Sequence, residues 1–198
     1  MLAGGVAIAL GVYFLEPKLL YFARKYTKGE ILVVEQYLHF HGLKLQKLEI
    51  ADEQYSFLIR SLSSRDSGRE NRLVVLLGGN AMTALDWVSW IVEIRKYIED
   101  AAFLCVDYPG YGDSAGVPTP SSIDEKVNLS VLNAKSQLSE LKDIIVLGHS
   151  IGAAIAARWA STTSLPLSHI ILSAPFTSTA DMVPVLFPLV PAWVAKKL

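Results

Sequence analysis

One serine of this sequence stands in a pattern that supports nucleophilic catalysis. Residues 148–152 read GHSIG, which matches the pattern Gly-x-Ser-x-Gly around Ser150. The short apolar run 143–147 before it predicts a buried strand, and the alanine-rich segment 151–161 after it predicts a helix. A serine on such a sharp strand-to-helix turn needs glycine close by, because the strained backbone leaves little room for side chains. We therefore predict that Ser150 attacks a carbonyl carbon; the plainer alternative is a tight turn that happens to contain serine.

The attack of a serine on a carbonyl creates a negatively charged oxygen, which needs hydrogen-bond donors. The backbone N–H of Ile151 is the better-defined donor, because the first N–H groups of a helix have no partners within it. The second donor is expected from the loop 78–81 (GGNA), which follows the apolar run 73–77. Asn80 or Ala81 would supply it; the alternative is a loop that only turns the chain.

A second glycine-rich stretch, 107–114, reads DYPGYGDS. Residues 110–115 match G-x-G-x-x-A, a pattern that binds dinucleotides when it opens a helix. The segment that follows, 116–120, reads GVPTP, and we expect no helix to start there. We therefore reject a nucleotide cofactor and interpret 107–114 as a tight turn at a strand end near the pocket.

The remaining titratable side chains offer no clear general base. His39 and His41 precede the first predicted strand, and His149 belongs to the serine turn itself. His169 starts a predicted strand, which places it at the edge opposite the predicted site. The single cysteine, Cys105, lies in the middle of a predicted strand and is expected to be buried and inert.

The composition is that of one globular domain. The chain has 198 residues, of which 52% are apolar and 19% charged, and its net charge is −1. So apolar a chain is not intrinsically disordered, and a balanced charge provides no basic face for phosphates. One cysteine allows neither an internal disulfide nor a cysteine-based metal cage. We therefore predict no metal ion, no cofactor and no nucleic-acid partner.

Strands and helices alternate along the chain, which predicts an α/β fold. Two early strands are expected to form an antiparallel hairpin with a turn at 51–53; they are 44–50 and 54–61. Four apolar runs predict strands that are buried on both faces of a parallel sheet: 73–77, 101–107, 143–147 and 170–172.

Helices are expected to cover both faces of this sheet. One is predicted over 84–97, and another begins at a capping box formed by Ser122 and Glu125. The third is the alanine-rich segment 151–161. The proline-punctuated segment 176–198 predicts further short helices.

The N-terminus carries an apolar stretch that predicts a membrane anchor. Residues 2–15 contain no charge, and after a polar interruption the apolar character continues to Phe22. We favour a single-pass signal-anchor that ends around Phe22; a cleaved signal peptide and a soluble core helix are the alternatives. Basic residues follow the stretch, which by the positive-inside rule places the domain in the cytoplasm. They are Lys18, Arg24, Lys25 and Lys28.

Three motifs together make the sequence resemble the α/β-hydrolase family. They follow one another in the family's order: 78–80, 107–114 and 148–152. The sequence is most similar to membrane-anchored α/β-hydrolase domain proteins related to serine aminopeptidases and acyl-protein thioesterases, which carry a stretch like 19–22 (LLYF) after their anchor. Segment 173–198 is similar to their apolar segment after the sixth strand. The resemblance implies an anchor with a basic flank over 1–28 and an α/β-hydrolase domain over 29–198.

The sequence departs from the family pattern in two places. Gly78 stands where the family's loop usually has histidine. The resemblance also implies an acid and a histidine that follow the nucleophile in the chain. After Ser150 the sequence holds one acid, Asp181, and one histidine, His169, and neither is at a matching position. By pattern, the hydrolase domain is partial and C-terminally truncated, without its last strands, the acid and the histidine.

The resulting hypothesis is a membrane-anchored serine hydrolase that cleaves acyl ester, thioester or amide bonds of a small-molecule or lipidated substrate. Ser150 would be the nucleophile, and the N–H groups of Ile151 and the Asn80 loop would hold the oxyanion. Without the histidine, only a residual rate of roughly 10³–10⁴ over water would remain. One alternative is a catalytically incomplete, membrane-tethered binding protein or truncated isoform. Another is acyl transfer to an acceptor other than water.

Overall fold

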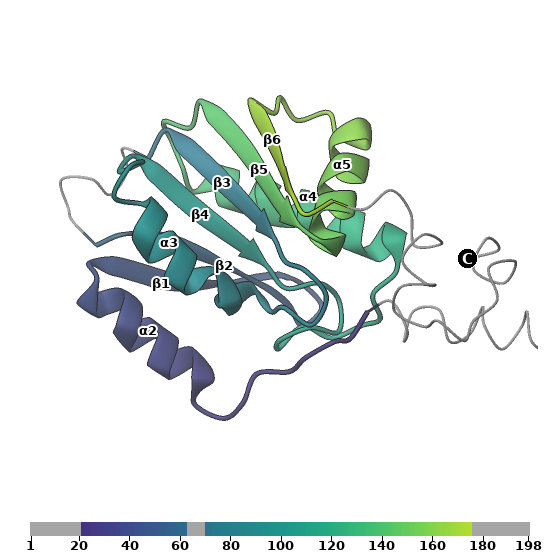
Figure 1. Cartoon of the computed structure of the whole chain (residues 1–198), viewed down its shortest axis with the longest axis horizontal. Helices are drawn as coiled ribbons and strands as arrows, with labels where there is room; N and C mark the ends of the chain where they lie inside the picture. The colour runs from purple at the N-terminus through teal and green to yellow at the C-terminus, as the bar shows by residue number, and fades with distance from the viewer. Residues whose placement is uncertain (1–20, 63–69, 176–198) are drawn as a thin grey trace, which may run out of the picture.

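The computed structural model describes residues 21–62 and 70–175, which form a sheet with helices on both faces (Figure 1). The predicted anchor segment before residue 21 and the predicted short helices of 176–198 lie outside the described residues. In the part of the chain that the structure describes, no helix combines the length and the apolar character needed to cross a membrane.

Six strands form the sheet, in the order β1-β2-β4-β3-β5-β6. Strands β3, β4, β5 and β6 run parallel, whereas β2 is antiparallel to both β1 and β4. The predicted mostly parallel sheet with an antiparallel hairpin at its edge is confirmed. The strands are β1 (Leu43–Ala51), β2 (Gln54–Ser61), β3 (Arg72–Leu77), β4 (Ala101–Val106), β5 (Asp143–His149) and β6 (His169–Ser173).

Helices cover both faces of the sheet, as predicted. Helix α2 and the 3-10 helix η1 with α3 lie on one face, and α4 and α5 lie on the other (Figure 1). Helix α2 is not among the elements that the sequence predicts. The helices are α2 (Glu30–Phe40), η1 (Ala84–Trp87), α3 (Val88–Ile94), α4 (Pro120–Ser136) and α5 (Ile151–Thr162).

The central strand β3 shows why the apolar runs of this sequence become parallel strands. Its residues alternate between two cores: Leu73, Val75 and Leu77 pack with α4 and α5, whereas Val74 and Leu76 pack with η1 and α3. All five side chains are buried. Each buried aliphatic side chain contributes about 1.5–3 kcal/mol of stability, so both faces hold the strand in place. The loop after β3 therefore starts from a rigid point.

The segment 84–97 is shorter and less regular as a helix than the sequence predicts. It begins as the 3-10 helix η1, continues as α3 and ends at Ile94. Thr83 and Asp86 form a capping box at its start, since the Thr83 N–H donates to Asp86 Oδ2 at 2.6 Å. This cap fixes the far end of the loop that follows β3.

Helix α4 begins earlier than predicted, and its cap is not the pair Ser122 and Glu125. The N-cap is Thr119, whose Oγ1 accepts the N–H of Ser122 at 3.1 Å, while Ser122 Oγ accepts the N–H of Thr119 at 2.9 Å. Pro120 occupies the first helical position, where its missing N–H costs nothing. The expectation that no helix starts in the GVPTP segment, 116–120, is therefore wrong, because α4 begins at Pro120, its last residue.

Strand β6 is predicted correctly as a strand but wrongly as buried. Ile170, Ile171 and Leu172 are 42–48% exposed. Among the described residues β6 pairs with β5 alone, so it is the outermost strand of the described sheet. An apolar run identifies a strand, but the neighbouring elements decide how far it is covered.

Candidate active site

Ser150 lies on a strand-to-helix turn between β5 and α5, as the sequence predicts. Its φ of 54° and ψ of −118° fall outside the regions that residues with a Cβ normally occupy. A conformation of this kind costs about 1–3 kcal/mol and persists only where the surrounding structure enforces it. Residues 148–152, which we call the serine turn, therefore hold Ser150 under strain.

Two glycines make the serine turn sterically possible. A Cβ on Gly148 would collide with the backbone oxygen of Gly152, and a Cβ on Gly152 would collide with the backbone oxygen of Leu77. The main chains of β5, α5 and β3 thus meet without space for a side chain. Both glycines of the motif are required by these contacts.

The loop after β3 reaches the serine turn. We call residues 78–82 the β3 loop. A Cβ on Gly79 would lie 3.4 Å from Ser150 Cβ and 3.3 Å from His149 Cδ2. The structure therefore brings together the two segments that the sequence singles out for chemistry.

The backbone N–H groups of Asn80 and Ile151, on the two segments that meet at Ser150, have no hydrogen-bond acceptor among the described residues. Ile151 is the first residue of α5, where an unpaired N–H is expected. The N–H of Ala81, in contrast, donates to Asn80 Oδ1 at 3.0 Å. Of the two loop donors that the sequence leaves open, Asn80 is thus the one whose N–H is available.

The described histidines do not supply a base for Ser150. His149 Nδ1 lies 3.1 Å from Ser173 Oγ, and among the described residues no hydrogen bond joins the His149 ring to Ser150. His169 begins β6, four residues before Ser173, and is thus about 13 Å from the serine end of the sheet. The expectation that it lies at the opposite edge is confirmed.

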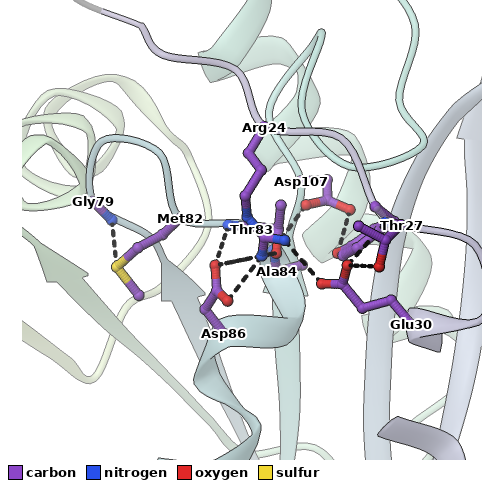
Figure 2. A network of polar contacts seen from close by, with 10 residues as sticks. Arg24, Thr27, Glu30, Gly79, Met82, Thr83, Ala84, Asp86 and Asp107 are labelled. Atoms are coloured by element: carbon purple, nitrogen blue, oxygen red, sulfur yellow. Dashed lines mark hydrogen bonds and ion pairs between the residues drawn. The ribbon is translucent and has the colours of Figure 1, made fainter. Parts of the chain in front are cut away.

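Asp107, at the end of β4, is a buried carboxylate with two donors (Figure 2). Its Oδ1 accepts the N–H of Ala84 at 2.7 Å, and its Oδ2 accepts the hydroxyl of Tyr26 at 2.8 Å. Burial raises the pKa of Asp107 to about 6, although both hydrogen bonds and the charge of Lys126 act in the opposite direction. Asp107 thereby links β4 to the residues that follow the β3 loop.

Lys126 on α4 is buried as well. Its Nζ has no hydrogen-bond partner among the described residues, and burial lowers the pKa of Lys126 to about 7. The attraction of Asp107 only partly offsets that effect. Both charged groups therefore lie in the interior, behind the loops of the site.

The stretch 107–114 is a turn at a strand end, as predicted. The Tyr108 hydroxyl donates to the backbone oxygen of Gly78 at 2.9 Å, so the turn holds the start of the β3 loop. Gly112 has a φ of 53°, and a Cβ there would collide with Asp107 Oδ2. The glycines serve this close packing, and no helix begins within 107–114.

Residues 21–28, which we call the arm, make contacts with the loops of the site that no sequence pattern predicts. Arg24 and Lys25 count in the sequence only as part of a basic flank. In the structure, Arg24 Nη2 donates to Thr83 Oγ1 at 2.6 Å, and Lys25 Nζ donates to the backbone oxygen of Ser114 at 2.8 Å. No local signal predicts these contacts, because the partners lie 59 and 89 positions away.

No candidate metal centre is found in the described part of the chain. There, no group of three or more histidine, cysteine, aspartate or glutamate side chains could hold an ion. Cys105 is buried within β4, as predicted, and burial raises the pKa of its thiol above the usual range. A deprotonated, reactive cysteine is therefore not part of this site.

The sequence has relatives that share part of its length. It is 38% identical to protein bem46 of Schizosaccharomyces pombe over 85 aligned residues. This alignment covers 42% of this chain and 28% of that protein. It is 31% identical to human protein ABHD12B over 113 aligned residues. This alignment covers 54% of this chain and 30% of that protein. The chain thus spans about a third of the length of the curated relatives it matches.

The fold is similar to that of solved structures. An alpha-beta hydrolase from Vibrio vulnificus superposes with a TM-score of 0.60 and 20% identity, over 87% of this chain and 60% of that chain. The Pyrococcus furiosus esterase Pf2001 superposes with a TM-score of 0.60 and 20% identity, over 80% of this chain and 60% of that chain. The model of the alpha/beta hydrolase family matches residues 74–197, more than half of the sequence. With a parallel sheet, a serine turn and this match, the chain belongs to the alpha/beta hydrolase family.

Proposed function

We propose that this chain is the nucleophile-bearing part of a serine hydrolase that cleaves acyl ester, thioester or amide bonds. The observation that carries the proposal is the strained backbone of Ser150 at the N-terminus of α5. Strain of this kind is retained where it serves a function, since an ordinary turn would relax it. The neighbouring N–H groups of Asn80 and Ile151 support the same proposal.

In this mechanism, Ser150 Oγ attacks the carbonyl carbon of the substrate while a general base takes its proton. The carbonyl oxygen becomes an oxyanion, which accepts hydrogen bonds from the N–H groups of Ile151 and Asn80. The positive end of the α5 dipole stabilises the same charge. The base returns its proton to the leaving alcohol, thiol or amine, and water then releases the acyl group from Ser150. In the family's order, the acid and the histidine follow the nucleophile in the chain.

Two of the similar proteins carry names that agree with this chemistry. The Pyrococcus furiosus protein is an esterase, and a relative from Mycoplasma genitalium, 24% identical over 103 residues, is described as a putative esterase/lipase. We extend from them to this chain only the class of reaction, which is hydrolysis of an acyl bond. A small-molecule or lipidated acyl compound is the substrate that this class implies.

Active-site labelling tests the proposal. The native full-length protein is incubated with a fluorophosphonate, which reacts with activated serines, and the labelled peptide is identified by mass spectrometry. We expect one adduct on Ser150 and none in Ser150→Ala. Thr163→Ala, at the far end of α5, is the matched control and should label like the wild type. Absence of an adduct on Ser150 contradicts the proposal, as does hydrolysis that persists in Ser150→Ala.

A second candidate function is a binding protein without hydrolytic activity. It is favoured by one observation: among the described residues, no histidine forms a hydrogen bond with Ser150 Oγ. In this case Ser150→Ala would bind an acyl compound as tightly as the wild type, and neither protein would turn it over. Acyl transfer to an acceptor other than water would instead show the Ser150 adduct together with product formation that depends on the acceptor.

We also propose that residues 1–28 form a membrane anchor with a basic flank and that the hydrolase domain, 29–198, faces the cytoplasm. The uncharged stretch 2–15 and the basic residues after it support this. The test is sedimentation with membranes after alkaline carbonate washing. The full-length protein should remain with the membranes, and a variant without residues 1–20 should not.

A further inference from the structure

The arm, 21–28, crosses both loops at the carboxyl edge of the parallel strands. The N–H of Phe22 donates to Asn80 Oδ1 at 2.8 Å, on the β3 loop. The backbone oxygen of Arg24 accepts the N–H of Gly112 at 2.8 Å, on the turn after β4. A segment near the start of the described chain thus joins the β3 loop to the turn after β4.

The side chain of Arg24 makes four hydrogen bonds to residues outside the arm (Figure 2). Its Nη2 donates to Thr83 Oγ1 at 2.6 Å and to both carboxylate oxygens of Asp86 at 2.9 and 3.0 Å. Its Nη1 donates to Glu30 Oε1 at 2.9 Å. One guanidinium therefore bridges the start of α2 and the start of η1.

These contacts act on the β3 loop because Thr83 is the residue that follows it. The loop leaves β3, which is fixed on both faces, and ends at the capping box of Thr83 and Asp86. Arg24 holds that capping box from outside. The loop is therefore fixed at one end by the sheet and at the other by Arg24.

Within the loop, the side chain of Asn80 is fixed by donors from both sides. Its Oδ1 accepts the N–H of Phe22 and, at 3.0 Å, the N–H of Ala81. These bonds leave the backbone N–H of Asn80 without an acceptor among the described residues. The arm thus contributes one of the hydrogen bonds that orient Asn80, beside those from Ala81 and, at 3.4 Å, from the Tyr111 hydroxyl.

We propose that Arg24 is a positioning residue that holds the β3 loop, and with it the Asn80 N–H, at the distance from Ser150 that the reaction needs. The proposal rests on the hydrolase function above. The side chain of Arg24 forms no hydrogen bond with Ser150 among the described residues, and it acts through Thr83 and Asp86. Its loss removes oxyanion stabilisation, which is made mainly in the transition state and lowers kcat more than it raises KM.

The test compares Arg24→Ala with Arg72→Ala in the native full-length protein. Arg72 begins β3 at the opposite edge of the sheet, bridges Asp100 at 2.7 Å and Asp143 at 3.9 Å, and is 39% exposed against 36% for Arg24. Both variants lose a bridging arginine of similar exposure. The readouts are the rate constant for fluorophosphonate labelling of Ser150, and kcat and KM for a p-nitrophenyl ester.

We expect Arg24→Ala to lower the labelling rate constant and kcat about 10- to 100-fold, below the loss seen when an oxyanion donor is deleted outright, with KM changed less than threefold. Arg72→Ala should leave both rates within twofold of the wild type. Arg24→Lys should recover part of the loss, because one ammonium can still reach Thr83 and Asp86 but cannot span to Glu30 as well. Equal rates in Arg24→Ala and Arg72→Ala, or an effect on KM alone, overturn the proposal.

Hydrogen–deuterium exchange separates this proposal from the proposed function. If wild-type Ser150 is not labelled, the hydrolase function fails and the catalytic role of Arg24 fails with it. Faster exchange of the 79–83 amides in Arg24→Ala, but not in Arg72→Ala, supports the positioning contact itself. Unchanged exchange in that segment overturns it, whatever the labelling result.

Discussion

The serine turn and the β3 loop meet at one edge of the sheet, but different forces hold them. Around Ser150 the backbone is fixed by steric exclusion, because the main chains of β5, α5 and β3 touch at Gly148 and Gly152. Around Asn80 it is fixed by hydrogen bonds from an arm that lies 58 positions away in the sequence. One part of the site, the serine turn, is thus encoded by a short motif. The other part, the β3 loop, is held by contacts with residues that are distant in the sequence.

Substitution of Gly152 should break the serine turn and have the largest effect. A Cβ in Gly152→Ala would overlap the backbone oxygens of Leu77 and Gly78, and Leu77 ends the buried strand β3, which cannot move aside. We expect the free energy of unfolding to fall by about 4 kcal/mol or more in urea denaturation, a value typical of severe backbone or core disruption. Ala157→Gly, on the exposed face of α5, is the control and should cost about 1 kcal/mol. A loss in Gly152→Ala no larger than that of the control would contradict the steric account.

The pH dependence of stability tests the network behind the β3 loop. Burial raises the pKa of Asp107 from 3.8 to about 6, so between these values the native state keeps a proton that the unfolded state releases. The contribution of Asp107 to the free energy of unfolding is therefore fully present below about pH 4. It falls by about 3 kcal/mol as the pH rises above 6. In Asp107→Asn this fall should be absent, although Lys126 and Asp113 remain titratable.

The measurement is urea denaturation of wild type and Asp107→Asn at several pH values from 4 to 7. Each pair of curves is taken at one pH, so that the titration of groups that do not interact with Asp107 cancels in the difference between the two proteins. As the pH rises, the free energy of unfolding of Asp107→Asn should increase relative to that of the wild type. A constant difference over this range would show that Asp107 titrates normally.

Strain at Ser150 predicts that glycine is tolerated there better than alanine. A φ of 54° with a ψ of −118° is accessible to glycine but costly for any residue with a Cβ. We expect Ser150→Gly to be more stable than Ser150→Ala by about 1–2 kcal/mol in thermal or urea unfolding, after the usual cost of glycine in the unfolded state is included. Both variants lack the hydroxyl, so the comparison isolates the backbone. A more stable Ser150→Ala would show that the turn is relaxed.

Replacement of glycine by alanine in the β3 loop, in Gly79→Ala, should have the smallest effect. A Cβ in Gly79→Ala would lie 3.3 to 3.4 Å from side-chain atoms of His149, Met82 and Ser150, which can shift by a few tenths of an ångström. We expect a change in unfolding free energy below about 1 kcal/mol, as for most substitutions without a steric clash. A loss as large as in Gly152→Ala would mean that the loop, too, is held by steric exclusion.

The parts of the site that could be predicted are those encoded by neighbouring residues. The strand, the serine and the helix of 143–162 follow one another directly, and both glycines of the motif are needed within that span. The hairpin turn is equally local, with φ values of 33° and 58° at Asp52 and Glu53. Strand β6 shows the limit, because its apolar run predicts a strand but cannot tell an edge from an interior position.

The sequence by itself therefore determined the α/β alternation, the parallel strands and the position of Ser150, since each depends on periodicity or on a motif a few residues long. Only the tertiary structure decided that Asn80 rather than Ala81 has the available N–H, and that Arg24 and Phe22 hold its loop. The physical reason is that these hydrogen bonds join residues 58 or 59 positions apart. Their partners are brought together by the packing of the whole sheet, and no local pattern records which donors will meet which acceptors.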